Sequence, residues 1–207
     1  MAYGMEILQD SGALWMSPDV TPMNHIDTIT QPIANGTVFQ SSVPQNKQAM
    51  FFVSYDANGV CAFQEGVTNG FRSLTVERFQ DMSVVTVYVF ANMAIRRSDY
   101  GIFMFNGAGE LTYSADMRPL QIQTATVSVA GDGVNVDVGQ PCAVLPTFSG
   151  RTTQPNSGVG GFNIFNYYTG STGNSVTNRR IQIGITSGPA GFTFSTTAFY
   201  IFTNMYN

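Results

Sequence analysis

Charge is scarce in this sequence, and positive charge is the scarcest. The 207 residues include 9 Lys plus Arg against 13 Asp plus Glu, and Lys47 is the single lysine. Charged residues make up 11% of the chain, where about 25% is typical of globular proteins. With a net charge of -4, the chain has no basic footprint for a phosphate backbone or an anionic membrane surface. The counts therefore exclude nucleic-acid binding by electrostatic attraction.

Long hydrophobic runs are also missing. No apolar stretch approaches the roughly 18 residues that a membrane-spanning helix needs, so we expect no membrane insertion. The opening sequence MAYGMEILQDSG lacks the basic region and the apolar core of a secretory signal. We therefore expect synthesis in the cytoplasm. Hydrophobic residues at 43% and aromatic residues at 13% are too abundant for a disordered chain.

Cysteine and histidine are too few for the usual metal and catalytic sites. Cys61 and Cys142 lie far apart without a CxxC motif, which predicts two buried free thiols. His25 is the one histidine and is expected to be a hydrogen-bonded structural residue or a surface residue, since a metal site needs three or four converging ligands. No cofactor or metal is predicted.

Catalytic motifs are absent as well. There is no GxSxG elbow beside a base, and no nucleotide-binding glycine motif precedes a predicted helix. The acids are scattered singly along the chain, although two carboxylates could still meet in space. The sequence therefore predicts no catalytic residues and a protein that is not an enzyme.

What is present is an internal repeat. Tyr3 to Asn24 is similar to Tyr100 to Gln121, and the later segment Ser83 to Met93 is similar to Ser195 to Met205. Matching segments that keep their order along the chain are the signature of tandem duplication. The repeat predicts two domains of the same fold.

The domain boundary is placed between the two copies. Domain 1 is predicted over residues 1–97 and domain 2 over residues 98–207, with the short polar joint 95–99 between them. The joint is not rich in Gly, Ser or Pro, so the copies should pack against each other. In such a duplication Phe90 and Phe202 should occupy equivalent strand positions.

Residues repeated in both copies are expected to be structural. Tyr3 and Tyr100 are interpreted as packing residues of the core. Asp19 and Asp116 each precede a Pro-containing turn, where a carboxylate accepts backbone N–H bonds and fixes the corner.

The expected secondary structure is nearly all β. Short aromatic runs at the start of each copy are followed by Gly-containing turns at Gln9 to Gly12 and Asn106 to Gly109, which predicts a β-hairpin opening each copy. Later segments alternate apolar and polar residues with period two. The predicted fold class is all-β, with two tandem duplicated β-sandwich-like domains or small barrels.

The two copies differ most in one segment. Between Phe162 and Ser195 the second copy is longer than the first copy between Phe63 and Ser83, so an extra segment is predicted around 163–194. The Gly-rich stretch 150–173 is expected to be a surface loop with aromatics. Aromatic residues among Asn and Thr suit a protein interface or a sugar-stacking surface, although an ordinary extra hairpin is equally compatible. The candidate partner-contact residues are Phe165, Tyr167, Tyr168, Arg179 and Arg180.

The opening pattern of each copy carries a resemblance. YGMEILQDSGALWMSPDVTP and YGIFMFNGAGELTYSADMRP share YG, a short apolar strand, a turn with Gly, a second strand and SxDxxP. This pattern resembles a module in small tail proteins of long-tailed bacteriophages, encoded near tail-tip and tail-fibre components. The resemblance implies a virion structural protein without catalytic residues, made in the host cytoplasm. Its partners would be other virion proteins and copies of itself, with a carbohydrate- or host-receptor-binding module as the alternative.

Overall fold

The computed structural model describes residues 7–8, 10–12, 14–16, 21–97, 99–128, 134–158, 160–193 and 197–207. Across these residues the chain forms β-strands and one short 3-10 turn, Thr203–Met205. The predicted all-β class is confirmed. No helix among the described residues has the length and apolar character to cross a membrane.

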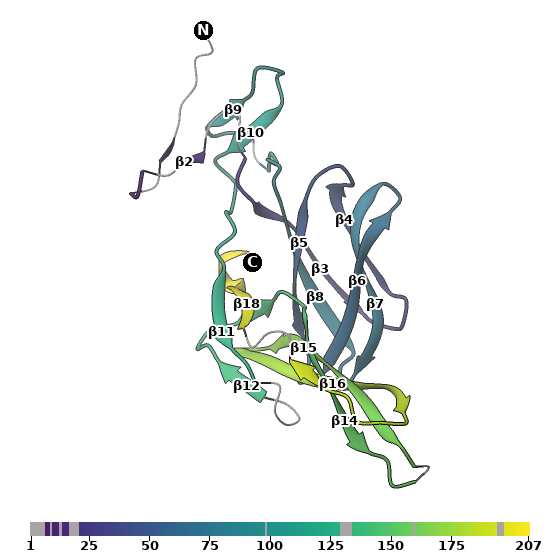
Figure 1. The fold of residues 1–207 in the computed structure, drawn as a ribbon. Helices are drawn as coiled ribbons and strands as arrows, with labels where there is room; N and C mark the ends of the chain where they lie inside the picture. Colours follow the sequence, from purple (N-terminus) through teal and green to yellow (C-terminus); the bar gives the residue numbers. More distant parts are fainter. Residues whose placement is uncertain are drawn as a thin grey trace.

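The first half forms a sandwich of two layers with three strands in each (Figure 1). One layer has the order β3 (Asn24–Pro32), β8 (Val84–Ala91) and β5 (Ala49–Tyr55). The other has the order β4 (Val38–Pro44), β7 (Phe71–Gln80) and β6 (Val60–Thr68). Apolar side chains of both layers fill the space between them, because burying apolar area contributes about 25 cal/mol per Å².

The second half repeats this pairing order. Its first layer has the order β11 (Gln123–Thr126), β18 (Thr197–Phe202) and β13 (Cys142–Val144). Its second has the order β12 (Val134–Asp137), β16 (Ser175–Thr186) and β15 (Phe162–Thr172). β14 (Phe148–Pro155) and β17 (Phe192–Thr193) extend the second layer beyond β15. A repeated pairing order is what a duplication would produce, and the duplication and its boundary stay predictions.

The predicted equivalence of Phe90 in β8 and Phe202 in β18 is wrong. In β8, Val85 and Val87 face the main core, while Phe90 faces the opposite side of the sheet. In β18, Tyr200 and Phe202 face the main core. Strand side chains alternate between faces, so aligning Phe90 with Phe202 is out of register by one residue.

The Gly-rich stretch also differs from its prediction. Residues 150–173 are not a surface loop, because β14 covers Phe148–Pro155 and β15 covers Phe162–Thr172. The two strands pair antiparallel over most of their length. The aromatic and β-branched residues of β15 favour a strand when a neighbouring strand packs against them, and this outweighs the glycines of the stretch.

The two halves share one sheet. β5 pairs with β13 through Val53 and Val144, so the first layers of both halves join edge to edge. Ser171 of β15 strengthens the junction, because the carbonyls of Val53, at 2.8 Å, and of Cys142, at 3.0 Å, share the single proton of its hydroxyl. The largest hydrophobic cluster of the described residues therefore contains side chains of both halves.

Close packing at this junction depends on a glycine. The Tyr55 ring, 4% exposed, lies against Gly170 of β15 so closely that a Cβ at Gly170 would overlap it. A residue without a side chain is therefore required there.

The outer face of the shared sheet is covered by the carboxyl-terminal end of the chain. The Tyr206 ring packs edge-on against Phe90 with ring centroids 4.8 Å apart. Its hydroxyl donates to the carbonyl of Pro119 at 3.0 Å and accepts from the amide of Gln121 at 3.0 Å. His25 lies in the same cluster, 5.5 Å from Tyr206 between ring centroids.

Each half begins with a two-stranded hairpin, as predicted. β1 (Ile7–Leu8) pairs with β2 (Leu14–Met16), and β9 (Phe103–Phe105) pairs with β10 (Leu111–Ser114). The β9–β10 hairpin lies at one end of the molecule (Figure 1).

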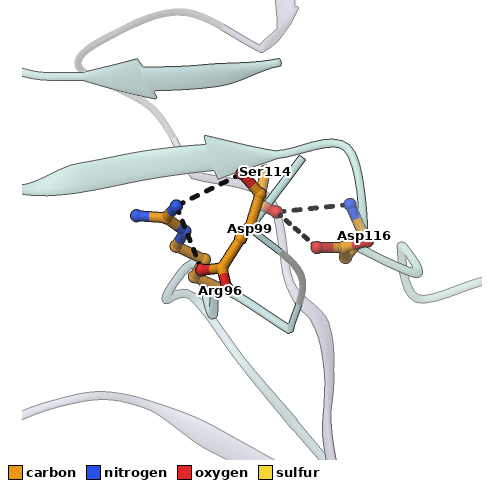
Figure 2. Close-up of polar contacts among 4 residues, drawn as sticks. All are labelled: Arg96, Asp99, Ser114 and Asp116. Carbon is orange, nitrogen blue, oxygen red and sulfur yellow. Dashed lines mark hydrogen bonds and ion pairs between the residues drawn. The ribbon is translucent and has the colours of Figure 1, made fainter. Parts of the chain in front are cut away.

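The joint between the halves lies at the base of this hairpin. Arg96 forms an ion pair with Asp99 at 3.3 Å and lies 4.7 Å from the centre of the Phe103 ring. Figure 2 shows Arg96 and Asp99 beside the corner that follows β10. At this corner the Ser114 hydroxyl donates to the Asp116 carboxylate at 3.3 Å and accepts a hydrogen bond from the Asp116 backbone amide at 3.2 Å. Both bonds join Asp116 to the Ser114 side chain, and the predicted backbone N–H bonds to the Asp116 carboxylate stay a prediction. Asp19 and Tyr3 lie outside the described residues.

The two cysteines are free and buried, which confirms their prediction. Burial raises the pKa of Cys142 to about 11 and that of Cys61 well above its usual range.

Only a thiolate is reactive, so native protein should not react with a disulfide reagent at pH 8. Both thiols should react once guanidinium unfolds the chain. The measurement is release of the chromophore with time, and a fast phase in the native state would contradict the expectation.

Candidate functional site

The five candidate contact residues lie on the β15–β16 hairpin, but they do not form one surface. Tyr167 is 2% exposed, and the other four are partly buried. Tyr167 and Tyr168 are successive residues of β15, so they point to opposite faces. Replacing Tyr167 would therefore disturb packing, and Tyr167 is not available to a partner.

Tyr168 packs inside the molecule as well. It lies against a small apolar cluster that holds Val60 and Ala62 of β6 and Ile181 of β16. On its other side the Phe148 ring lies 5.6 Å away between centroids. Tyr168 therefore holds the β15–β16 hairpin against the first half.

Three of the five residues do come together. Phe165, Arg179 and Arg180 line a recess of about 200 Å³ at the seam between the two halves. The Arg180 guanidinium lies over the Phe165 ring, 4.3 Å from its centre. Such stacking limits the orientations of the guanidinium.

The first half supplies the opposite wall of the recess. Gln80 ends β7 and Asp81 follows it, and the Gln80 amide donates to the Asp81 carboxylate at 3.2 Å. Asp81 has a left-handed backbone with φ of 60°, a conformation that Asp tolerates better than most residues. The lining is completed by Val60 and Gln182.

Sequence reasoning missed the residues of this opposite wall. Gln80 and Asp81 belong to the other half of the chain, and no local motif marks them. Only the contact between the end of β7 and the β15–β16 hairpin identifies these two residues, and a single sequence does not reveal that contact.

Large apolar side chains are also exposed on the β9–β10 hairpin and on the residues just before it. Ile102 is 62% exposed and Phe105 is 55% exposed. Tyr100, interpreted from the sequence as a core residue, is 89% exposed, so that interpretation is wrong. Other residues of the hairpin are covered, since Met104 and Thr112 are buried.

His25 is a structural residue. Its Nε2 lies 2.9 Å from the Thr28 hydroxyl, and an Arg97 nitrogen lies 3.4 Å from its Nδ1. Since a guanidinium only donates, Nδ1 is the acceptor and Nε2 carries the proton. Burial, and then the charge of Arg97, lower the pKa of His25 from 6.5 to about 4. Over the described ranges no three His, Cys, Asp or Glu side chains are grouped as a metal site would need.

Comparisons with protein-family models, with curated proteins and with solved structures find no match to this chain.

Proposed function

We propose that the chain is a non-enzymatic structural component of a bacteriophage virion, from the tail-tip or tail-fibre region. It would contact other virion proteins and copies of itself. The observation that carries the proposal is the exposure of the apolar side chains Ile102 and Phe105 at the β9–β10 hairpin. This hairpin belongs to the segment Tyr100 to Pro119, which resembles the tail-protein module.

The hairpin has the chemistry of a protein contact. Residues 100–114 contain a single charged side chain, Glu110. Ile102 and Phe105 expose more than half of their surface, and large apolar side chains exposed at one end of a folded protein are candidates for an interaction site. Fully burying one such side chain contributes about 1.5–3 kcal/mol, so two of them can anchor a subunit contact.

The assembly role is tested by removing these anchors. The double substitution Ile102→Ser/Phe105→Ser should leave the circular dichroism spectrum and melting temperature unchanged, because both side chains are exposed. Incorporation into particles should fall at least tenfold. The measurement is quantitative mass spectrometry of purified particles after complementation of a phage that lacks the gene for this chain.

A matched control changes exposed apolar residues elsewhere. Val67→Ser/Ile185→Ser removes two side chains that are 48% and 54% exposed on the sandwiches, and incorporation should stay normal. Normal incorporation of the hairpin variant would contradict the assembly role.

A carbohydrate- or host-receptor-binding module is the second candidate function. The seam recess favours it, because Phe165, two arginines and three further polar residues line it. Under this function, variants of the recess would enter particles normally and the particles would lose adsorption to host cells.

A further inference from the structure

We propose that strand β11 pairs edge to edge with β11 of a second copy of this chain, so that one sheet continues through both copies. This contact is separate from the β9–β10 hairpin and does not depend on the virion role. The first layers of both halves form one row in the order β3, β8, β5, β13, β18 and β11. Among the described residues, β3 and β11 each end this row with one edge that pairs with no other strand.

The β3 edge is closed by features of the chain itself. A break in register between His25 and Asp27 interrupts its ladder, and Asp27 adds a charge. The Arg97 guanidinium donates to the carbonyls of His25 and Ile26, both at 3.1 Å. The strand ends at Pro32. Bulges, charged residues and proline are the means by which proteins prevent pairing at an edge, so β3 is unsuited to a partner strand.

The β11 edge lacks these protective features. Its pairing with β18 keeps one register over all four residues, Gln123–Thr126. Residues 121–128 include no proline and no charged residue. In an antiparallel ladder every second residue directs its N–H and C=O groups away from the paired strand. These groups can pair with an added strand, as in other cases of β-strand addition.

Side chains supplement this short ladder. Thr124 pairs with Phe199 of β18, and Ile122 lies on the same face two positions before Thr124. Ile122 and Phe199 are each 42% exposed. An antiparallel pair centred on Gln123 places Ile122 of one copy opposite Thr124 of the other, beside that copy's Phe199. Both apolar side chains lose exposed area in this register, which therefore favours it over the alternatives.

The charge pattern favours a second copy as the partner. In a two-fold contact the same patch of both subunits meets, and like charges placed opposite each other are unfavourable. The uncharged segment 121–128 meets this requirement in a chain whose net charge is -4. The chain already contains a contact of this kind, because β5 and β13 join the first layers of its two similar halves edge to edge.

The first test is a disulfide cross-link in the isolated full chain. Gln123 is exposed and would lie opposite Gln123 of the second copy, so Gln123→Cys should form a covalent dimer under mild oxidation. The native cysteines are buried and should not contribute. The matched control is Thr30→Cys, an exposed position of β3 at the other end of the row. Non-reducing electrophoresis should show at least tenfold less dimer for this control.

The second test measures association by sedimentation between about 10 μM and 1 mM, the range of a weak contact. The wild type should show a monomer–dimer equilibrium. Thr124→Lys and Thr124→Glu should each weaken it at least tenfold, because the two substituted side chains are diagonal neighbours across the pair and repel. An equal mixture of these two variants should restore association to within about threefold of wild type. Thr30→Lys should leave it unchanged, and circular dichroism reports whether each variant is folded.

Four results would overturn the proposal. They are a wild type that stays monomeric at the highest concentration, equal losses from Thr124→Lys and Thr30→Lys, a Lys and Glu mixture that does not associate, and equal cross-linking of the two cysteine variants. None of them concerns the hairpin variant Ile102→Ser/Phe105→Ser. A failure here is therefore distinct from a failure of the virion role.

Discussion

Replacing Gly170 by alanine is expected to destabilise the protein by about 3 kcal/mol, at the upper end of the usual effect of overpacking a core. The new Cβ would overlap the Tyr55 ring and would also approach the Thr177 hydroxyl to 3.2 Å. The ring is buried at the junction of the halves and has no open space to enter. The measurement is the free energy of unfolding from urea titration.

The neighbouring strand provides the matched control. Gly184 of β16 has no atom within 4 Å of a built Cβ, so Gly184→Ala should be near neutral or slightly stabilising. Adding Tyr55→Leu to Gly170→Ala should remove part of the clash, and the double variant should lose less stability than the two single variants combined. If Gly170→Ala and Gly184→Ala had equal effects, the close approach of Tyr55 would be disproved.

The second large effect is a loss of stability in mild acid. The pKa of His25 is about 4 in the folded protein, against 6.5 for an imidazole that is fully exposed to water, as in the unfolded chain. Between these values the unfolded chain binds a proton that the folded chain does not, so stability is full above pH 6.5 and falls as the pH is lowered to 4. A difference of this size corresponds to roughly 3 kcal/mol.

A variant without the titrating ring isolates this contribution. In His25→Gln an amide can still donate to Thr28, but it gains no proton in this range. The difference between the unfolding free energies of wild type and His25→Gln should therefore change by roughly 3 kcal/mol between pH 7 and pH 4. A constant difference across that range would show that His25 is not buried beside Arg97.

The sequence was sufficient for the fold class and insufficient for the arrangement of the halves. Period-two alternation in β8 and the turn Asn106 to Gly109 depend on local residues, so the strands and hairpins could be predicted from them. Alternation tells which face of a strand is buried but not which strand lies beside it. The pairing of β5 with β13 joins segments from different halves, and no local pattern encodes that choice.

The candidate site was predicted in part for the same reason. Phe165, Arg179 and Arg180 do meet at one recess, but the adjacent Tyr167 is buried. Alternation along β15 could have shown that two successive tyrosines cannot both face a partner. The exposed hairpin was missed because apolar residues occupy both of its faces, and only the packing of a two-stranded hairpin decides which face is covered.

The shared sheet also bears on how the chain is made. The second edge of β5 stays unpaired until the ribosome has made β13, whose Val144 pairs with Val53. Ribosomes add about 5–20 residues per second. During that delay the nascent first half presents an unpaired apolar strand edge, which is a template for joining another chain. Two nascent chains on one messenger RNA can therefore pair wrongly through their β5 edges. Synthesis of the second half prevents this, because β13 then covers the β5 edge.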